Sequence, residues 1–448
     1  MTNNLFGTDG IRGVANEFPM TAEVAFRLAQ TLSVMVCNNT KRVAIAKDTR
    51  ISGDMLESAL IAGFTSMGTD VVKMGVVPTP LVTAQTRNLN VDMAVMITAS
   101  HNPYQDNGIK LINCVGDKFD DALTSKVEEL LTSNETFQPS KEALGKVFED
   151  TKSIELYMEN ARNVAPDYNA LKGLRVVLDC ANGVFSKIMP QIFKDLGAGV
   201  ITLSNTPNGY NINKDCGSQH TENLQKVVVE SKAHIGIAVD GDGDRIIICD
   251  ENGNRIDGDQ IIAFLATYFH EHNMLKGNAV VATIWSNMGL EKYLHRLGIH
   301  YYRSAVGERY VIDKMREFGS NVGGEESGHM VLSDYATTGD ALITAIVICL
   351  GLIQSSKKMS EIFPMFEKCP CQISNIRFLS VEEAVYALNA HSVQEIIASA
   401  KRKIEGMGSV IVRKSGTEPV IKVRVEGENE TLVSDISNMI VSEISKYK

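Results

Sequence analysis

The chain has 448 residues, of which 44% are hydrophobic and 22% charged, and this composition excludes a disordered chain, a collagen-like fibre and a small disulfide scaffold. Its 54 acidic residues outnumber its 44 basic ones, which gives a formal net charge of -10 at pH 7. This acidic balance argues against nucleic acid or an anionic membrane surface as the main partner, because both require a basic face.

A set of three strand patterns, the last of them followed by a polar or glycine-rich loop, recurs three times along the chain. The first set lies at 42–47, 70–77 and 92–98, the second at 174–179, 197–204 and 234–240, and the third at 278–285, 299–306 and 321–326. Helical patterns lie around these strands, at 21–35, 52–67, 187–196 and 260–272. The longest apolar run, 341–353, is too short to span a bilayer and predicts a buried core helix.

These patterns predict α/β domains built on one plan. Continuous Val, Ile and Ala runs are typical of parallel strands buried on both faces, and their alternation with helices predicts right-handed crossover units. In each set the third strand leads into a distinctive loop, at 98–103, 240–245 and 324–329. Because open α/β sheets bind ligands beyond the carboxyl ends of their strands, we expect these loops to share one cleft.

The chain after residue 369 follows a different pattern. It predicts an extended segment at 372–379, helices at 381–390, 392–405 and 432–444, and two strands around Gly416. We therefore expect three similar α/β domains with mixed, mostly parallel sheets, plus a smaller C-terminal α+β domain, around a central cleft. The predicted domain boundaries are 1–152, 153–255, 256–368 and 369–448.

The loop Asp-Gly-Asp-Gly-Asp-Arg at 240–245 predicts a metal site. Asp240, Asp242 and Asp244 can converge on one hard cation such as Mg²⁺, and the glycines between them allow a tight backbone. A calcium EF-hand would need glycine where Arg245 stands, and helices where strand patterns flank the loop. An acidic turn without a metal is the remaining alternative, although three carboxylates this close repel one another.

Ser100 lies in the loop Thr-Ala-Ser-His-Asn-Pro at 98–103, directly after a buried strand pattern. A serine exposed there could act as a nucleophile or carry a phosphoryl group, and an ordinary turn is the alternative. The chain lacks the Gly-x-Ser-x-Gly elbow of a serine hydrolase. With a metal loop in the same cleft, phosphoryl transfer is the better interpretation.

Three further segments carry groups that suit a sugar phosphate. Arg-Lys-Ser-Gly-Thr-Glu-Pro at 413–419 can form an anion-binding turn, and Gly-Gly-Glu-Glu-Ser-Gly-His at 323–329 offers groups for sugar hydroxyls. Arg12 follows two glycines near the N-terminus and could reach an anion. The alternatives are a plain surface turn at 413–419, a glycine-rich β-turn at 323–329 and an ordinary glycine-rich N-terminus around Arg12. No P-loop or dinucleotide fingerprint occurs, which disfavours a nucleotide enzyme.

The cysteines predict a reduced protein of the cytoplasm. All eight are scattered, and the one close pair, Cys369-Pro-Cys371, lacks the spacing of a zinc site. The N-terminus has neither the basic nor the apolar region of a signal peptide. We therefore expect a cytoplasmic protein without a membrane partner.

Four of the loops described above, taken in chain order, resemble those of the α-D-phosphohexomutase family, and the resemblance covers essentially the whole chain. The family carries Ser-His-Asn-Pro, Asp-Gly-Asp-Gly-Asp-Arg, Gly-Glu-x-Ser-Gly-His and Arg-x-Ser-Gly-Thr-Glu-Pro, which here lie at 100–103, 240–245, 324–329 and 413–419. The segments 6–16, 106–110, 216–218 and 334–340 are similar to the branch of the family that acts on glucosamine phosphates.

The resemblance implies a role for each candidate residue. Ser100 would be the phosphoserine that donates and recovers the phosphoryl group, and its phosphate would hold one Mg²⁺ together with Asp240, Asp242 and Asp244. Arg12, His101, Lys110 and Arg245 would surround the reacting groups, with Lys110 or His101 as the acid/base. The sugar would be contacted by Glu325, Ser327 and His329, and its distal phosphate by Arg413, Ser415, Gly416 and Thr417.

The implied reaction is the reversible conversion of glucosamine 6-phosphate to glucosamine 1-phosphate through a glucosamine 1,6-bisphosphate that reorients in the cleft. A kinase or a bisphosphate donor would first phosphorylate Ser100, and a homodimer is one option for the assembly. Lys414 and Lys422 replace the usual proline and arginine, and Glu326 replaces the usual glutamine. Glu326 keeps open a phosphomannomutase or phosphoglucomutase, and a non-catalytic protein that binds a metal or sugar phosphate is the alternative from another class.

Overall fold

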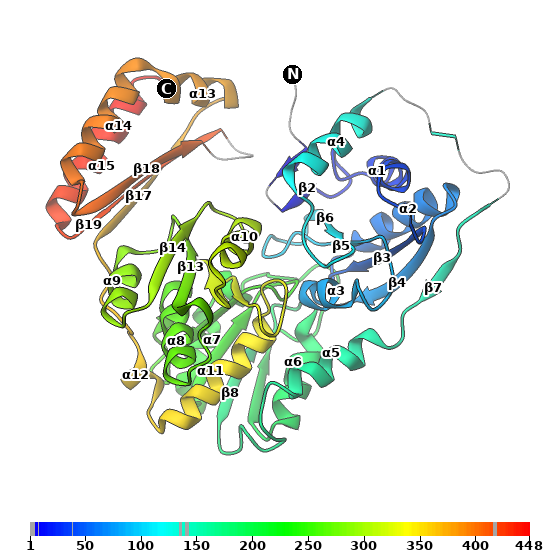
Figure 1. Cartoon of the computed structure of the whole chain (residues 1–448), viewed down its shortest axis with the longest axis horizontal. Helices are drawn as coiled ribbons and strands as arrows, with labels where there is room; N and C mark the ends of the chain where they lie inside the picture. Colours follow the sequence, from blue (N-terminus) through cyan, green and yellow to red (C-terminus); the bar gives the residue numbers. More distant parts are fainter. Residues whose placement is uncertain (1–4, 8, 38, 134–136, 139–142, 415–418) are drawn as a thin grey trace. The chain divides into compact units, whose positions relative to one another are not determined.

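The computed structural model describes the whole chain except residues 1–4, 8, 38, 134–136, 139–142 and 415–418 (Figure 1). The chain forms two compact units. The first consists of Met1–Trp285 and Ile299–Met365, and the second of Ser286–Gly298 and Phe366–Lys448. The boundaries predicted within the chain, after residues 152, 255 and 368, remain predictions.

The first unit contains a 7-stranded sheet whose centre is parallel. Strands β3 (Arg42–Lys47), β4 (Asp70–Val76) and β5 (Met93–Ile97) run parallel, with β3 between the other two. Strand β6 (Asp106–Asn113) pairs antiparallel with β5. The sheet is completed by β1 (Phe6–Gly7) and β2 (Gly10–Val14) beyond β6, and by β7 (Val147–Glu149) beside β4.

Two further sheets of this unit repeat the arrangement. The 5-stranded sheet joins the parallel strands β8 (Arg175–Asp179), β9 (Gly199–Leu203) and β10 (Ile235–Val239) to the antiparallel β11 (Ile246–Cys249) and β12 (Arg255–Ile256). The 4-stranded sheet joins the parallel strands β13 (Ala279–Thr283), β14 (His300–Ser304) and β15 (Val322–Gly324) to the antiparallel β16 (Met330–Leu332).

The three sheets therefore share one strand order: an antiparallel strand, then the third, first and second parallel strands of each set. The loop between the third parallel strand and the antiparallel one is the distinctive loop in every case, at 98–105, 240–245 and 325–329. This confirms the predicted class of α/β fold with mixed, mostly parallel sheets. Of the antiparallel strands, β11 confirms the strand pattern expected after the metal loop, whereas β6 and β16 were not predicted, because β6 begins with polar residues and a glycine and β16 is short.

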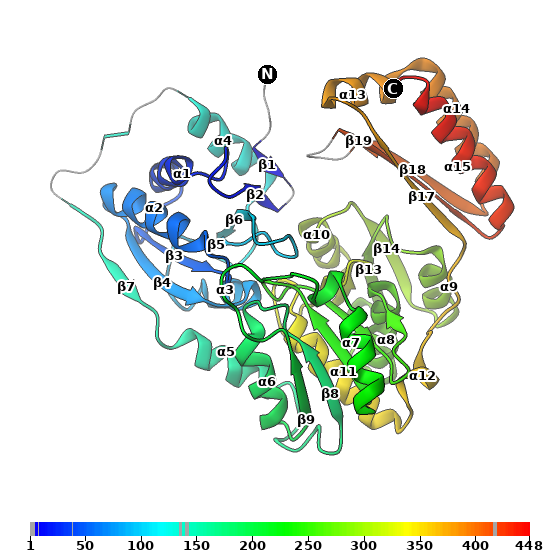
Figure 2. The ribbon, with the colours of Figure 1, turned by 180° about the vertical axis from the view of Figure 1, so that it is seen from behind.

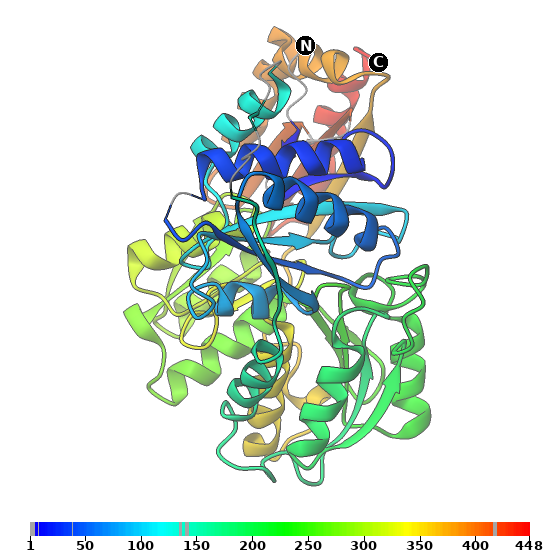
Figure 3. The same cartoon turned by 90° about the vertical axis from the view of Figure 1, so that its right-hand side faces the viewer.

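Helices cover these sheets. In the 7-stranded sheet, α1 (Ala22–Met35) and α2 (Gly53–Ser66) lie on one face and α3 (Thr79–Gln85) on the other (Figures 1 and 3). Leu28, Leu32, Leu60 and Phe64 of α1 and α2 form one buried core with the strands. The other helices of this unit are α4 (Asp121–Thr132), α5 (Ser153–Arg162), α6 (Phe185–Asp195), α7 (Glu222–Ser231), α8 (Gly258–Glu271), α10 (Glu308–Phe318), α11 (Ala341–Ser355) and α12 (Met359–Ile362).

Helix α11 contains the apolar run at 341–353, and its residues from Ala341 to Leu352 are all buried. The prediction of a buried core helix is confirmed. The carboxylate of Asp340 caps its start, since Oδ1 accepts a hydrogen bond of 3.0 Å from the amide of Ile343. Among the described residues, no helix is both long and apolar enough to cross a membrane.

Asp340 is expected to make stability depend on pH. Burial raises its pKa to about 6, although hydrogen bonds from Ile343 and Tyr157 oppose the rise. The folded chain then binds a proton more tightly than the unfolded one, so the free energy of unfolding falls as pH rises from about 4 to about 6, by up to about 3 kcal/mol. Asp340→Asn keeps the cap and should remove this fall. Urea unfolding of both proteins at about pH 5 and about pH 8 measures it, and parallel pH dependences would contradict it.

The second unit contains a 3-stranded antiparallel sheet in the order β17 (Cys371–Arg377), β19 (Val420–Gly427) and β18 (Gly408–Lys414). The helices α13 (Val381–Asn389), α14 (His391–Ile404) and α15 (Glu430–Ser445) pack on one face of this sheet (Figures 1 and 2). This confirms the predicted smaller α+β fold near the C-terminus.

Helix α9 (Met288–Arg296) also belongs to the second unit, although it follows β13 in the sequence. The Glu426 carboxylate of β19 accepts a hydrogen bond of 2.6 Å from the amide of Met288, at the first turn of α9. The side chain of Asn287 exchanges hydrogen bonds with the backbone of Cys369, and Lys292 pairs with Glu428. A helix inserted between two strands of the 4-stranded sheet is thus held by the C-terminal segment.

Candidate active site

Three aspartates converge in the loop that follows β10. Asp240, Asp242 and Asp244 are all buried, and each offers a carboxylate oxygen within 4.8 Å of the others. The loop can turn this tightly because Gly243 has a φ of +78°, and a Cβ there would lie 2.4 Å from the ring of Phe185. The three carboxylates therefore cluster in the structure, as the sequence predicts.

The free oxygens of this cluster suit a hard cation. Oδ1 of Asp242 and Oδ1 of Asp244 are buried and accept no hydrogen bond from the described residues. Oδ1 of Asp244 makes longer ion pairs, with Nδ1 of His329 at 3.6 Å and Nε of Arg245 at 3.9 Å. A buried carboxylate oxygen without a hydrogen bond is costly, and a divalent cation with oxygen ligands would satisfy both atoms. The residues present thus fit a magnesium-type ion.

Ser100 lies directly beside this cluster. Its hydroxyl donates a hydrogen bond of 2.6 Å to Oδ2 of Asp240, and Nδ1 of His101 lies 3.4 Å from the same hydroxyl. The residue is buried and has a φ of +52°, which is uncommon for a residue other than glycine. Strained backbone of this kind persists only where the surrounding structure holds it, and it occurs often at active sites.

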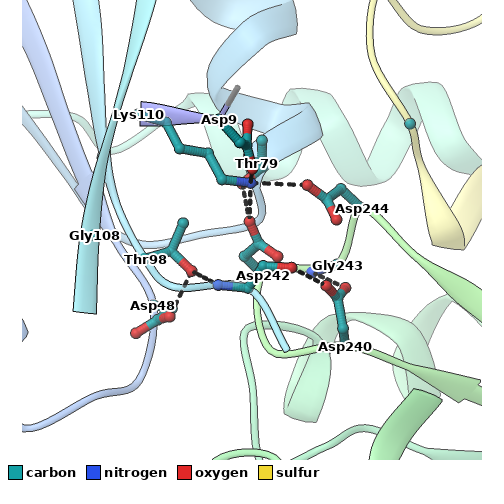
Figure 4. Close-up of polar contacts among 12 residues, drawn as sticks. Asp9, Asp48, Thr79, Thr98, Gly108, Lys110, Asp240, Asp242, Gly243 and Asp244 are labelled. Carbon is teal, nitrogen blue, oxygen red and sulfur yellow. Dashed lines mark hydrogen bonds and ion pairs between the residues drawn. The ribbon is translucent and has the colours of Figure 1, made fainter. Parts of the chain in front are cut away.

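Lys110 extends from β6 into the same cluster (Figure 4). Its ammonium group donates hydrogen bonds to Oδ2 of Asp242 at 2.7 Å and to Oδ2 of Asp244 at 2.9 Å, and lies 3.2 Å from Oδ2 of Asp9. The hydroxyl of Thr79 donates a third bond, of 2.7 Å, to Oδ2 of Asp242. Lys110 thus engages the Oδ2 atoms and leaves the two Oδ1 atoms for a cation.

The cluster pushes the pKa values of its members apart. Burial and the charges of Asp244 and Asp242 hold the pKa of Asp240 well above its usual range. Burial acts in the same direction on Asp244, but Lys110 and His329 outweigh it and hold the pKa of Asp244 well below that range. Burial would lower the pKa of Lys110, but its carboxylate neighbours raise it well above the usual value.

His101 differs from Lys110 in its surroundings. Burial, together with the charges of Arg245 and Arg12, lowers the pKa of His101 to about 4. The imidazole is therefore neutral near pH 7, whereas Lys110 is an ammonium. The two residues predicted as alternatives for acid/base work thus lie at one site with opposite protonation states.

A ring of alternating charges links the metal loop to the sugar loop at 324–329. From Lys110 it runs to Asp9, whose Oδ1 lies 2.5 Å from Nζ of Lys118, and Lys118 pairs in turn with Glu308. Nε2 of His329 lies 2.9 Å from Oε1 of Glu308, and Nδ1 of His329 lies 3.6 Å from Oδ1 of Asp244, which closes the ring.

The ring places His329 between two carboxylates. Burial would lower its pKa, but Glu308 and Asp244 raise it to about 10, so the imidazole carries a positive charge. Asp9, Lys118 and Glu308 were not identified from the sequence. Charged residues in loops and at helix starts usually lie in solvent, and only their folded neighbours show that these three are paired.

The other predicted residues of the first unit lie around the same centre. Nη2 of Arg12 lies 2.6 Å from Oδ2 of Asp9. The backbone of Arg245 forms an isolated bridge with that of His329, which ties the metal loop to the sugar loop. Glu325 accepts a hydrogen bond of 2.9 Å from the amide of Gly307, and the hydroxyl of Ser327 donates one of 3.2 Å to Glu325.

The predicted residues for the distal phosphate belong to the second unit. Arg413 lies near the end of β18, directly opposite Lys422 of β19 in the strand register. Two cationic side chains therefore start from neighbouring positions on the paired strands. Ser415, Gly416 and Thr417 fall outside the described residues.

Comparison with protein families finds four matching models along the chain. They are described as phosphoglucomutase/phosphomannomutase alpha/beta/alpha domains I, II and III, matched at residues 3–138, 155–253 and 257–369, and the C-terminal domain, matched at residues 376–443. Together these models cover most of the chain.

Curated relatives match over the full length. A protein of Paramagnetospirillum magneticum is 45% identical over 449 residues, covering 100% of this chain and 99% of the relative, and it is named phosphoglucosamine mutase. A protein of the same name from Mesorhizobium japonicum is 44% identical over 454 residues, covering 100% of this chain and 99% of the relative.

Solved structures share the fold. A phosphoglucomutase/phosphomannomutase family protein of Burkholderia thailandensis superposes with a TM-score of 0.82 at 24% identity, covering 100% of this chain and 98% of that one. The N-acetylphosphoglucosamine mutase of Aspergillus fumigatus, solved with GlcNAc-6P and magnesium, has a TM-score of 0.66 at 16% identity and covers 99% of this chain and 96% of that one. At these identities the likeness concerns the fold alone.

Proposed function

Because the chain belongs to the phosphoglucomutase/phosphomannomutase family, we propose that it is the isomerase that interconverts glucosamine 6-phosphate and glucosamine 1-phosphate. The full-length relatives at 44% to 45% identity are named for this activity. The observation that carries the proposal is the hydrogen bond of 2.6 Å between the hydroxyl of Ser100 and Asp240, inside the aspartate cluster.

The reaction follows from that geometry. Ser100, phosphorylated on Oγ, gives its phosphoryl group to the free hydroxyl of the sugar phosphate: the bond from phosphorus to Oγ breaks and a bond from phosphorus to the sugar oxygen forms. The hydroxyl proton needs a base: His101 is neutral near pH 7 and can accept it, whereas Lys110, an ammonium here, would first have to lose its own proton. The resulting 1,6-bisphosphate reorients, and its other phosphoryl group passes to Oγ of Ser100: the bond from phosphorus to the second sugar oxygen breaks, and that oxygen takes the proton held by the base. The isomeric monophosphate is then released.

The aspartates would hold Mg²⁺, together with the phosphate on Ser100. Such an ion offsets the negative charge of the phosphoryl group that is being transferred. The chain's own contribution is orientation: Lys110 and Thr79 fix the Oδ2 atom of Asp242, and the amides of Gly243 and Arg245 each donate a hydrogen bond of 3.1 Å to Oδ1 of Asp240.

The remaining roles concern the rest of the substrate. Arg12 and Arg245 would bind the reacting phosphoryl group, and Glu325, Ser327 and His329 would contact the sugar. Arg413, Ser415, Gly416 and Thr417 would bind the phosphate that does not react, with Lys422 as a further cation beside Arg413. One catalytic centre must accept both ends of the sugar, so a separate phosphate site lets either end be presented to Ser100.

The cellular context forms part of the proposal. All eight cysteines are free, which supports a reducing compartment such as the cytoplasm. The first phosphate on Ser100 would come from a kinase or from a glucosamine 1,6-bisphosphate or related bisphosphate. A homodimer is the assembly to test.

A substrate comparison tests the proposal. We expect kcat/KM for glucosamine phosphate to exceed that for glucose and mannose phosphates by about 100-fold, which corresponds to about 2.7 kcal/mol. The assay contains Mg²⁺ and a bisphosphate primer, and intact mass establishes that the protein carries the phosphoserine. A preference for mannose or glucose phosphate would leave the proposed mechanism in place and change the proposed substrate. Glu326 is the residue that favours this second candidate, a phosphomannomutase or phosphoglucomutase. No turnover of any of them by phosphorylated protein would overturn the mutase assignment.

A further inference from the structure

The loop that carries Ser100 is held through its backbone carbonyl groups. Arg50, in the loop after β3, donates from Nη2 to the carbonyl oxygens of Ser100 at 3.0 Å and Asn102 at 2.8 Å. Its Nη1 donates to the carbonyl oxygens of Asp106, at 3.0 Å, and Pro103. A single guanidinium group therefore holds three carbonyls of the loop and the first carbonyl of β6, which uses the planar fork that distinguishes arginine from lysine.

A second side chain holds two of the same carbonyls from another sheet. Nδ2 of Asn213, in the loop between β9 and α7, donates to the carbonyl oxygens of Ser100 at 2.8 Å and of Asn102 at 3.0 Å. The two donors come from segments that flank different sheets, the 7-stranded and the 5-stranded one. Ser100 is thus fixed to a segment of the 5-stranded sheet, the sheet whose loop carries Asp240.

Asp48 links Arg50 to the amide of Ser100 through the hydroxyl of Thr98. Its Oδ2 accepts hydrogen bonds from Nε of Arg50 at 2.9 Å and from the hydroxyl of Thr98 at 2.6 Å, and the side chains of Asp48 and Arg50 are both 0% exposed. The hydroxyl of Thr98, which donates to Asp48 (Figure 4), in turn accepts a bond of 2.9 Å from the amide of Ser100. Both the amide and the carbonyl of Ser100 are therefore fixed, in the left-handed conformation that a serine rarely adopts.

We propose that Arg50 and Asn213 form a carbonyl clamp, a pair of positioning residues that keeps Oγ of Ser100 at one place through both phosphoryl transfers. This inference rests on the proposed function, in which Ser100 is first donor and then acceptor. Both side chains bond to backbone carbonyls of the loop rather than to Oγ of Ser100. A displacement of about 1 Å at a reacting atom can cost about 100-fold in rate, so a clamp of this kind acts on turnover rather than on substrate binding.

The test compares Arg50→Ala, Arg50→Lys and Asn213→Gly with the wild-type protein. Glycine is chosen because residue 213 has a φ of +56°, where alanine would be strained. We expect kcat to fall by about 100-fold in Arg50→Ala with KM within about 3-fold, because only the position of Ser100 changes. Added methylguanidinium, which carries the same planar fork, should restore at least about one tenth of the lost rate. Arg50→Lys should stay slow, because lysine keeps the charge but not the fork.

A matched control separates positioning from stability. Phe64→Leu weakens the core of the same layer without touching the Ser100 loop, and it should lower the melting temperature while kcat stays within about 2-fold. If Arg50→Ala fails to fold, Asn213→Gly, which removes only two neutral hydrogen bonds, carries the test, with an expected loss of about 10-fold in kcat. Wild-type kcat in both variants would overturn the clamp.

Hydrogen exchange makes the result independent of turnover. The amides of residues 101, 102 and 104–106 should exchange at least about 10-fold faster in Arg50→Ala and Asn213→Gly than in the wild-type and Phe64→Leu proteins. Unchanged exchange in the variants overturns the clamp. Absence of turnover in the phosphorylated wild-type protein overturns the proposed function instead, and the exchange measurement still decides the clamp.

Discussion

Ser100→Ala is expected to abolish mutase activity, with a loss in kcat/KM of about four orders of magnitude or more, while the fold is retained. The reason is chemical: the substitution removes the oxygen that must accept and donate the phosphoryl group, and losses of this size follow when an enzyme loses its nucleophile. The fold should persist because the amide and carbonyl contacts of residue 100 involve backbone atoms, which alanine keeps.

Two measurements check this result. Mutase turnover is compared with intact mass after incubation with a bisphosphate, and the wild-type protein should gain one phosphoryl group that Ser100→Ala does not. Ser66→Ala is the matched control, because the hydroxyl of Ser66 only bonds to the carbonyl of Gly63 within α2. Turnover in Ser100→Ala at the wild-type level would refute the assignment of Ser100.

Asp242→Asn is expected to lower the affinity for Mg²⁺ by more than about 100-fold, and activity with it. The change replaces one carboxylate of the cluster and removes a charge at the Oδ1 atom that is free for a cation. Even residues that only support metal ligands typically cost about 10 to 100-fold in affinity when changed, so the loss of a ligand should exceed that range. Lys110 would remain paired with Asp244 and Asp9.

Calorimetric titration with Mg²⁺ and Mn²⁺ measures this affinity without reference to turnover. Asp250→Asn serves as the control, because Asp250 is a buried aspartate in the turn after β11 whose carboxylate accepts hydrogen bonds from the amides of Asn252 and Asn254. It should bind Mg²⁺ as the wild-type protein does. Equal affinities in wild type and Asp242→Asn would refute the metal site.

Much of the fold could be predicted because strands that are buried on both faces have recognisable, continuously apolar sequences. Runs such as Val43 to Ala46 and Ile235 to Val239 are apolar without alternation, which is typical of strands covered on both faces, and the structure confirms them as β3 and β10. The loops after such strands could then be assigned to one edge of each sheet. The antiparallel strand β6 escaped prediction because it begins with Asp106, Asn107 and Gly108, which are typical of a turn.

The supporting residues of the site could not be predicted for a different reason. Asp9, Lys118 and Glu308 lie far apart in the sequence, and each becomes paired only when the segments that carry them meet. Arg50 follows a strand in a segment that resembles any polar loop, yet its side chain is fully buried. A single sequence shows which residues are charged, but tertiary contacts decide which charges are enclosed.

The placement of α9 limits how far this protein can be treated as modular. The C-terminal unit is joined to the rest of the chain by three peptide connections, at 285/286, 298/299 and 365/366, rather than by a single linker. Cutting the chain after Met365 would deprive the first turn of α9 of Glu426 and leave Lys292 without Glu428. The C-terminal segment is therefore not an exchangeable cassette: a graft from a relative must carry α9 with it, or restore its contacts residue by residue.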